Sequence, residues 1–305
     1  MIYTVTMNPA VDISLCVRAG LMPGSINKSY AMRTDPGGKG INVSKVLKAL
    51  GTESVICTGI CGPDGDRLKE MLTPDFEVLS VDYPAGNTRT NIKIAGENGV
   101  TTDVNADGPL YDMSSYEKLK AAVLEKLGTG DIVVISGSVL PGAPSEIYAD
   151  LIRAFNSVDG VRVILDASGR YLKKGIEACP YAVKPNCDEL GIDNDPETAK
   201  SEAERIFSQY GTRCLISMGS SGAVYAGGNG EAFFADALDV KVRNTTGCGD
   251  AMTAGLAFSL ENNMTPADTF RLCLALAAAE AETEGTDPPS KERVEELLGA
   301  PICGQ

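Results

Sequence analysis

Residues 244–255 read Asn244-Thr245-Thr246-Gly247-Cys248-Gly249-Asp250-Ala251-Met252-Thr253-Ala254-Gly255, a glycine-rich turn that leads into a helix. Gly247 and Gly249 allow a tight turn with no Cβ in the way, so that backbone N–H groups can converge on an anion at the positive end of the helix dipole. Asp250 then lies where a general base would act on a hydroxyl group. The stretch therefore predicts phosphoryl transfer, and the alternative is a strand-to-helix turn that Asp250 merely caps.

A second glycine turn, far away in the sequence, favours the functional interpretation. It reads Pro36-Gly37-Gly38-Lys39-Gly40-Ile41-Asn42-Val43. The apolar residues that follow recur at helical spacing as far as Gly51, a residue type that commonly ends helices. The turn itself carries a cation, Lys39, and an amide side chain, Asn42. Two such turns on one chain predict that two ligands meet.

Short β-rich segments alternate with amphipathic segments, which predicts βα units on a mostly parallel sheet with helices on both faces. The expected strands are residues 2–6, 55–58, 132–136, 161–165, 181–183, 214–217 and 223–225, and the expected helices include residues 116–127 and 199–210. Residues 13–34 and 90–104 instead alternate polar and apolar with no helix between, as an antiparallel layer with one solvent-facing side does. A surface hairpin would show the same pattern.

Composition excludes several classes of function. The net charge of -14 argues against nucleic acid or an anionic membrane as a partner, because both would repel the surface. The chain contains no histidine, which removes Ser-His-Asp hydrolysis, histidine-bound metals and histidine bases. Any proton acceptor is then expected to be a carboxylate or something more unusual.

The sequence carries no readable targeting or membrane segment. Its first residues begin directly as a short strand, and no apolar stretch approaches the roughly 20 residues of a membrane span. The nine cysteines include no Cys-x-x-Cys pair, so reduced thiols are expected rather than disulfides or zinc ligands. These features predict a cytoplasmic protein.

Four motifs in this order resemble the ribokinase-like sugar kinases, and more narrowly their phosphofructokinase B branch, which includes 1-phosphofructokinases and tagatose-6-phosphate kinases. The motifs are Asn8-Pro9-Ala10-Val11-Asp12, the Gly37-to-Val43 run, Val183-Lys184-Pro185-Asn186-Cys187-Asp188-Glu189-Leu190, and the Thr245-to-Asp250 run. The resemblance extends from Ile2 to about Leu298. It implies a single domain, residues 1–305, with a three-layer α/β/α fold and a small β lid formed by about residues 12–34 and 88–108. The lid would cover the sugar site, and a homodimer could form through it.

The implied reaction is ATP-dependent phosphoryl transfer to a primary hydroxyl of a ketohexose monophosphate. The favoured acceptor is fructose 1-phosphate, which would give fructose 1,6-bisphosphate, and the alternative is tagatose 6-phosphate, which would give tagatose 1,6-bisphosphate. Asp250 would be the base, and the amides of Gly247, Cys248 and Gly249 would hold the charge that develops on the transferred group. Magnesium and Lys184 would neutralise the phosphates of ATP.

The remaining candidate residues divide between the two ligands. Asp12 could bind a sugar diol, or it could simply be a turn residue. Arg89, together with Lys39 and Lys28, could bind a phosphate already present on the substrate, or Arg89 could be a solvent-exposed surface residue. Gly37, Gly38 and Asn42 complete the expected substrate site. Asn186 and Glu189 suit magnesium held through its waters, although Asn186 could instead cap a short helix. The expected ATP-binding residues are Lys184, Asn186, Ser217, Gly219, Gly222 and Thr246, of which those at 217–222 could equally form a hairpin turn.

Two rival functions remain at this point. A nicotinamide dehydrogenase would need Gly-x-Gly-x-x-Gly after an early strand, and the nearest match, at Gly247, lies late and lacks the third glycine. A sugar-phosphate sensor without catalysis would not need Asp250. A P-loop kinase is excluded, because no Gly-Lys is followed by Ser or Thr.

Overall fold

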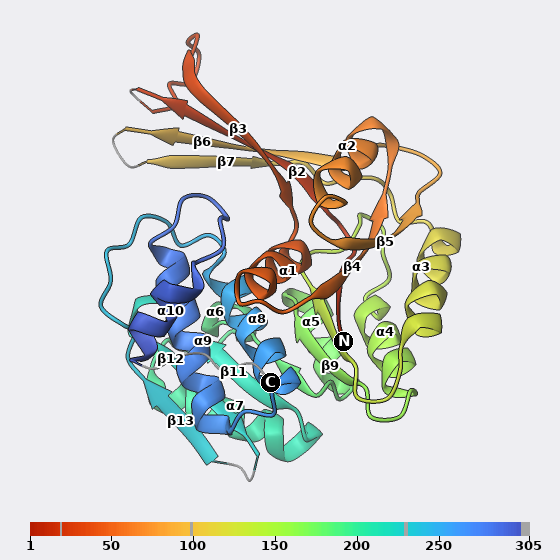
Figure 1. The fold of residues 1–305 in the computed structure, drawn as a ribbon, viewed down its shortest axis with the longest axis vertical. Helices are drawn as coiled ribbons and strands as arrows, with labels where there is room; N and C mark the ends of the chain where they lie inside the picture. The colour runs from red at the N-terminus through yellow and green to blue at the C-terminus, as the bar shows by residue number, and fades with distance from the viewer. Residues whose placement is uncertain (19, 98–99, 229–230, 300–305) are drawn as a thin grey trace.

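The computed structural model describes residues 1–18, 20–97, 100–228 and 231–299. Within these ranges, nine strands form one large sheet and four strands form a smaller one (Figure 1). In spatial order the large sheet consists of β13 (Glu231–Ala235), β12 (Ala223–Gly227), β11 (Arg213–Ser217), β10 (Ala182–Val183), β9 (Arg162–Asp166), β8 (Ile132–Ser136), β1 (Ile2–Thr6), β4 (Ser54–Ile60) and β5 (Glu77–Asp82). Every neighbouring pair is parallel except β11–β12 and β12–β13, which are antiparallel. The prediction of a mostly parallel sheet is confirmed.

Helices cover both faces of this sheet because its strands are apolar on both sides. On β8, Val133 and Ile135 contribute to one buried cluster, whereas Ile132 and Val134 contribute to the other. The first cluster packs under α3 (Met113–Lys126), α4 (Ile147–Asn156), α5 (Gly169–Glu177) and α7 (Pro196–Tyr210), and the second under α1 (Lys39–Ala49), α8 (Cys248–Glu261), α9 (Pro266–Ala281) and α10 (Lys291–Leu298). A third, smaller cluster lies under α2 (Gly62–Leu72). This is the expected three-layer α/β/α fold.

The smaller sheet, called the lid sheet below, projects from the body of the molecule (Figure 1). Its order is β3 (Ser29–Gly37), β2 (Ala10–Val17), β6 (Arg89–Gly96) and β7 (Thr101–Asn105). The expectation of an antiparallel layer is wrong at its centre, where β2 and β6 are parallel. The reason is topological: β2 follows β1 and β6 follows β5, two parallel strands of the large sheet, so both leave the same edge in the same direction.

The carboxyl ends of the parallel strands carry the polar residues that matter for function. Asp166 ends β9, Lys184 follows β10 directly, and Ser217 ends β11. The helices α1 and α8 begin at this edge, at Lys39 and Cys248. Open α/β sheets bind ligands in this position, because loops and helix N-termini converge there.

The cysteines of the described chain, eight in number, all carry free thiols, as expected from the sequence. The ninth, Cys303, lies outside the described residues. Among the helices of the described ranges, none has the length and apolar character needed to cross a membrane.

Candidate active site

A cavity of about 810 Å³ lies where the carboxyl edge of the large sheet, the start of α8 and the lid sheet meet. It brings together most of the candidates that the sequence predicts from separate motifs. These cavity-lining residues are Asp12, Gly38, Lys39, Asn42, Arg89, Lys184, Asn186, Glu189, Ser217, Gly219, Gly222, Thr246, Gly247, Cys248, Gly249 and Asp250. Gly37 and Lys28 do not line it.

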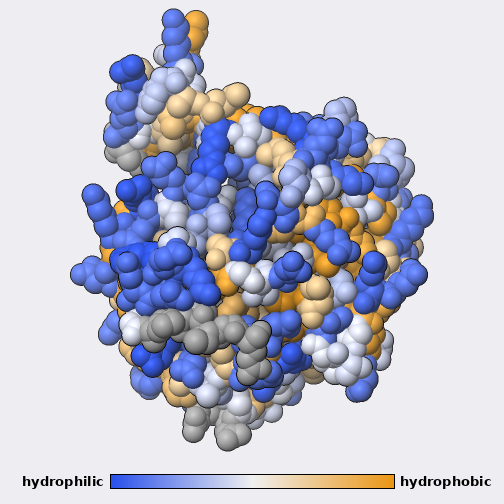
Figure 2. Space-filling model, viewed as in Figure 1, coloured by the Kyte–Doolittle hydropathy of each residue, from blue (hydrophilic) through white to orange (hydrophobic). Residues whose placement is uncertain are grey.

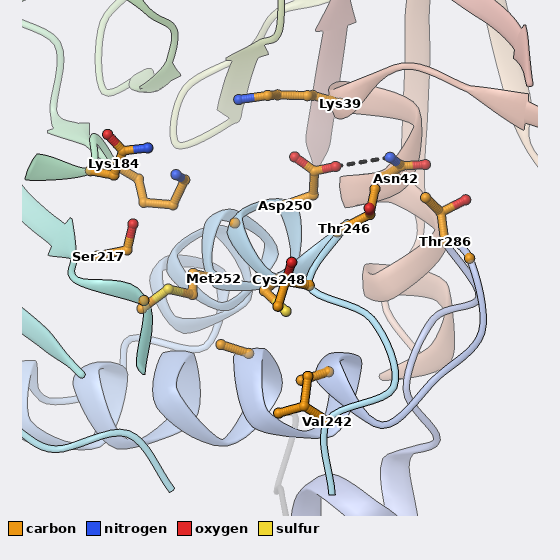
Figure 3. A pocket seen from close by; sticks show the side chains of 18 of the residues that line it. Lys39, Asn42, Lys184, Ser217, Val242, Thr246, Cys248, Asp250, Met252 and Thr286 are labelled. Atoms are coloured by element: carbon orange, nitrogen blue, oxygen red, sulfur yellow. Dashed lines mark hydrogen bonds between the residues drawn. The ribbon is translucent and has the colours of Figure 1, made fainter. Parts of the chain in front are cut away.

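Asp250 lies in the first turn of α8 and is buried, with 6% of its surface exposed. Asn42 Nδ2 donates a hydrogen bond of 2.8 Å to Asp250 Oδ2, and Figure 3 shows the Lys39 side chain extending across the cavity near the same carboxylate. Burial, and then the negative charge of Asp166, raise the pKa of Asp250 to about 6, although Lys39 and Asn42 act in the opposite direction. A carboxylate with this pKa is ionised at neutral pH and is still basic enough to accept a proton.

The turn before Asp250 has the geometry of an anion-binding site. Gly247 precedes α8 with φ 93, a conformation that L side chains rarely adopt, and a Cβ there would lie 2.3 Å from Glu280 Oε1. The first N–H groups of α8 have no partners within the helix and are available to a ligand. Burial raises the pKa of the Cys248 thiol to about 11, so this cysteine remains a neutral thiol at the turn.

Glu280 lies beneath this turn and was not predicted from the sequence. It is buried on α9, and its Oε2 atom has no hydrogen-bond partner in the described chain. Burial, followed by the charge of Asp250, raises its pKa to about 8. The carboxyl group is therefore mostly protonated at neutral pH, which spares the anion-binding turn a nearby negative charge.

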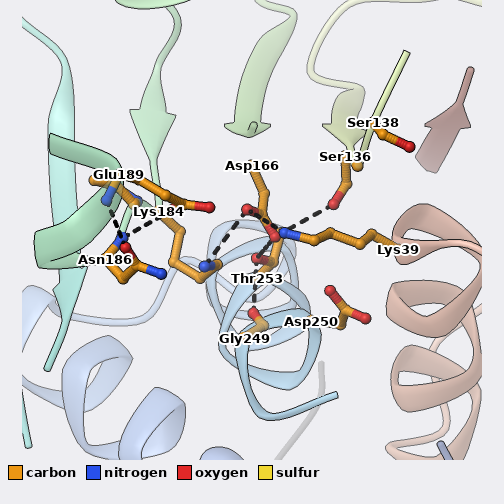
Figure 4. A network of polar contacts seen from close by, with 12 residues as sticks. Lys39, Ser136, Ser138, Asp166, Lys184, Asn186, Glu189, Gly249, Asp250 and Thr253 are labelled. Atoms are coloured by element: carbon orange, nitrogen blue, oxygen red, sulfur yellow. Dashed lines mark hydrogen bonds and ion pairs between the residues drawn. The ribbon is translucent and has the colours of Figure 1, made fainter. Parts of the chain in front are cut away.

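Asp166 is the second site residue that the sequence analysis missed. It is fully buried, and its Oδ1 atom lies 3.4 Å from Lys39 Nζ and 3.5 Å from Lys184 Nζ (Figure 4). The hydroxyls of Ser136 and Thr253 lie 3.3 Å from its other oxygen. Burial by itself would raise the pKa of Asp166, but the two lysines outweigh it and hold that pKa below its usual value. The sequence feature that could have identified Asp166 is its position as an acidic residue at the end of a buried strand.

The pairing of Lys39 with Arg89 as a clamp for a phosphate on the substrate stays a prediction. The two residues line the same small cavity, and the Lys39 ammonium also lies 3.4 Å from Asp166 Oδ1. Attraction to Asp166 raises the Lys39 pKa, burial opposes this rise, and Asp250 adds to it. The cause is that α1 begins at Lys39, beside the carboxyl ends of β8 and β9, so its side chain lies next to the buried carboxylates.

Arg89, at the start of β6, lines the cavity from the lid sheet. Its guanidinium donates hydrogen bonds to the backbone carbonyls of Asn8 (2.9 Å) and Ala106 (3.5 Å), and its Nε–H has no partner among the described residues. It also lines a smaller cavity of about 170 Å³, together with Asn8, Lys39 and Ser138. Burial lowers the Arg89 pKa from its ordinary value, which is so high that the group remains charged.

Asp12 lies on β2, next to Asn91 of β6, whose Nδ2 atom donates a 2.8 Å hydrogen bond to Asp12 Oδ1. Gly37 has an indirect role: a Cβ at this position would lie 2.1 Å from Asp12 Oδ2, so any larger residue would displace the carboxylate. Burial raises the pKa of Asp12. Asp12 lines the cavity, where its carboxylate could accept hydrogen bonds from ligand hydroxyls.

The prediction for Lys28 needs correction, whereas Asn186 and Glu189 line the cavity as expected and also form the helix cap that was offered as the alternative. Lys28 is exposed before β3, at the end of the lid sheet opposite to Asp12, and is remote from the cavity. Asn186 and Glu189 do cap a short helix, α6 (Cys187–Leu190): Glu189 N donates to Asn186 Oδ1 (2.7 Å) and Asn186 N donates to Glu189 Oε2 (3.0 Å). Both side chains nevertheless line the cavity.

This arrangement fits magnesium only through its water shell. The described chain has no group of three or more His, Cys, Asp or Glu residues that could enclose a metal. The capping hydrogen bonds fix Asn186 and Glu189, both of which line the cavity, and the oxygens of their side chains keep lone pairs that these bonds do not use. A cation that keeps several waters and binds mainly to substrate phosphates needs no more than this.

The part of the cavity beyond Lys184 is lined by Ser217, by the short helix η1 (Gly219–Ser221) and by apolar side chains. The apolar residues there include Met218, Leu238, Val242, Met252 and Leu274. An apolar slot beside a lysine and an anion-binding turn suits a ligand with a flat ring and a chain of phosphates.

Comparisons with known proteins agree with this geometry. Residues 5–293 match the profile of the pfkB family carbohydrate kinases. The chain is 33% identical to 1-phosphofructokinase from Borreliella burgdorferi, over 92% of each chain, and 29% identical to tagatose-6-phosphate kinase from Staphylococcus epidermidis, over 98% of this chain and 97% of the relative. It also superimposes on phosphofructokinase-2 from Escherichia coli in complex with potassium, with a TM-score of 0.91, 26% identity and 98% of each chain covered.

Proposed function

The chain belongs to the pfkB family of carbohydrate kinases, and on this basis we propose that it transfers the γ-phosphoryl group of ATP to a primary hydroxyl of a ketohexose monophosphate. The favoured acceptor is fructose 1-phosphate, and fructose 1,6-bisphosphate is the product. Relatives named 1-phosphofructokinase support this choice. Tagatose 6-phosphate is the second candidate, because a relative with nearly full coverage is named for it.

The observation that carries this proposal is the buried Asp250 carboxylate beside the anion-binding turn. Asp250 accepts the proton of the acceptor hydroxyl while the hydroxyl oxygen attacks the γ-phosphorus, and ADP leaves with the electrons of the broken P–O bond. Asn42 holds the carboxylate in place through its 2.8 Å hydrogen bond. The amides at Gly247, Cys248 and Gly249 bind the oxygens of the transferred group, where negative charge develops.

Donor phosphates would lie between this turn and Lys184. Lys184 contributes a positive charge that Asp166 holds in position, with 3.5 Å between their atoms. Magnesium held through waters near Asn186 and Glu189 would supply further positive charge to the phosphates of ATP. The apolar slot around Met218 and Met252 would take the adenine ring.

The phosphate already present on the acceptor would bind at Arg89. The guanidinium has an unpartnered Nε–H, and in the described structure it forms no ion pair, so a phosphate would be its first anionic partner. Asn8 and Ser138 line the same small cavity. Asp12 would bind two sugar hydroxyls between this clamp and Asp250.

We expect two copies of the chain to associate through the lid sheet. Large apolar side chains are exposed on its strands and connecting loop, namely Met22, Ile26, Tyr30, Met32 and Val104, and Figure 2 shows apolar surface on the projecting lid sheet. Sedimentation should show a dimer that the double variant Ile26→Glu, Met32→Glu converts to monomers. The reaction is expected to take place in the cytoplasm.

A panel of acceptors with ATP and magnesium tests the function. The expected order of kcat/KM is fructose 1-phosphate, then tagatose 6-phosphate and fructose 6-phosphate, with free fructose at least ten-fold lower because it lacks charge-assisted contacts to Arg89. If tagatose 6-phosphate gives the highest kcat/KM, it replaces fructose 1-phosphate as the proposed acceptor. Equal rates for free fructose would contradict the phosphate clamp, and no ADP formation with any acceptor would contradict the kinase.

A further inference from the structure

Strand β6 crosses the cavity and presents every second residue to it. Arg89, Asn91 and Lys93 all line the cavity, as expected from the two-residue repeat of a strand. Arg89 lies against the carbonyl of Asn8, and Asn91 donates to Asp12. The ammonium of Lys93 donates a 2.9 Å hydrogen bond to Thr246 Oγ1, in the residue just before Gly247. One strand therefore reaches from the proposed phosphate clamp to the anion-binding turn, about 13 Å along the backbone.

Lys93 differs from the other lysines of the site in its electrostatic partners. Lys39 and Lys184 are both paired with Asp166. Lys93 and Arg89, in contrast, form no ion pair with any described residue, although Asp103 is the direct neighbour of Lys93 on β7. The cavity thus contains two cations that form no ion pair with a described residue, Arg89 at the start of β6 and Lys93 four residues further along, although the charge of Asp12 attracts both.

Besides the phosphates that stay on ADP, the proposed reaction brings two phosphoryl groups into the cavity, one on the acceptor and one in transfer. Arg89 would neutralise the first. We propose that Lys93 binds the second, as a cation that the lid sheet supplies to the phosphoryl group during its transfer. This inference rests on the proposed kinase function and adds a catalytic residue to it.

The geometry gives Lys93 a short distance to cover. Its ammonium already contacts Thr246, the residue that precedes the anion-binding turn. Because the four-carbon stem of a lysine is flexible, the three N–H donors could move from the Thr246 hydroxyl to a phosphoryl oxygen. The backbone amides of the turn would bind other oxygens of the same group. A cation at this point stabilises charge that spreads over the oxygens in the transition state. Transfer would then require the lid sheet to cover the cavity.

Three substitutions at Lys93 separate charge from hydrogen bonding. Lys93→Met removes both, Lys93→Gln keeps an N–H donor for Thr246 but removes the charge, and Lys93→Arg keeps the charge. We expect kcat to fall about 10²-fold in the first two variants, with little change in KM for ATP, and to recover largely in the third. Lys118→Gln, which removes an exposed lysine from α3, is the matched control and should keep the wild-type kcat.

Binding of a transition-state analogue gives a readout that a structural role would not affect. ADP with aluminium fluoride mimics the phosphoryl group in transfer. Calorimetry with ADP, aluminium fluoride and the sugar phosphate should show an affinity loss in Lys93→Gln of the same factor as the loss in kcat. Binding of ADP alone should remain unchanged in this variant.

The outcomes distinguish this inference from the function on which it rests. A wild-type protein that phosphorylates no acceptor would contradict the proposed function. A wild-type kinase whose Lys93→Gln variant keeps full kcat and full affinity for the analogue would leave the function intact and overturn the role of Lys93. An effect confined to KM for the sugar phosphate would also overturn it, because Lys93 would then contact the acceptor alone.

Discussion

The protonation of Asp250 should set the acid limit of activity. Its pKa is about 6, compared with 3.8 for an ordinary aspartate, because burial and Asp166 disfavour the charged form. A general base works only when deprotonated, so activity should be present above this pKa and should be lost as the pH falls through it. With a pKa of about 6, the ionised fraction is about nine-tenths at pH 7 and about one-tenth at pH 5, which predicts a ten-fold fall in kcat/KM.

Two variants should move this limit in opposite directions. Asn42→Ala removes the 2.8 Å hydrogen bond that favours the ionised Asp250, so its pKa should rise. A hydrogen bond to a charged group is worth about 1.5 to 3 kcal/mol, which corresponds to a rise of about one pH unit or more. Asp166→Asn removes a repelling negative charge and leaves Lys39 and Lys184 without their shared partner, so the pKa of Asp250 should fall.

The assay is kcat/KM for the sugar phosphate between pH 5 and 8, because this ratio reports the free enzyme. The acceptor's own phosphate also titrates near pH 6, but it does so equally for every enzyme, and the differences between variants isolate Asp250. Asp112→Asn, at the partly exposed N-cap of α3, is the control for loss of a carboxylate elsewhere. Identical acid limits in all variants, or displacement of both active-site variants in the same direction, would refute the assignment of Asp250 as the base.

Three further outcomes test other parts of the site. Asp250→Asn should lower kcat by roughly 10²-fold to 10⁴-fold while ATP binding, measured by calorimetry, stays nearly intact; wild-type turnover would exclude the base. Arg89→Ala should raise KM for the sugar phosphate far more than KM for ATP, with a larger loss at low salt, and equal effects on both substrates would show that Arg89 acts otherwise. Glu280 has a folded-state pKa of about 8 and an ordinary value of 4.5, so folding favours its protonated form and the stability that it contributes should be lost as the pH rises through about 8. The melting temperature of the wild type should therefore fall between pH 6.5 and 8.5, and that of the Glu280→Gln variant should fall less. If the melting temperatures of both proteins fall equally with pH, Glu280 is not a buried protonated carboxyl group.

Features that depend on neighbouring residues in the chain could be predicted from the sequence. The glycines around Cys248 and the aspartate that follows predict a helix start with free amides, and α8 does begin there. The alternation of apolar strands and amphipathic helices predicts the layers, because each segment must bury its own apolar face. The two glycine turns predict a place where two ligands meet, and the turns do lie close together, since Asn42 of the first hydrogen-bonds to Asp250 of the second.

Features that depend on distant partners could not be predicted in this way. Asp166 is an ordinary strand-end acid until the fold brings Lys39 and Lys184 to the same oxygen, 127 and 18 positions away in the sequence. The parallel pairing of β2 with β6 depends on where β1 and β5 end in the large sheet, and local alternation does not reveal this. The protonation of Glu280 depends on its burial under a turn of another helix.

The division of the cavity between two sheets has a consequence for how new activities could arise. Asp12, Arg89 and Asn91 belong to the lid sheet, whereas Asp250, Asp166 and Lys184 belong to the large sheet and its helices. Under the proposed roles, mutations in the lid strands at positions other than Lys93 can therefore change which acceptor fits without disturbing the groups that handle ATP. A laboratory selection for a new sugar phosphate should draw its successful substitutions from residues 10–37 and 89–105, and a graft of these strands from a relative should carry acceptor preference with it.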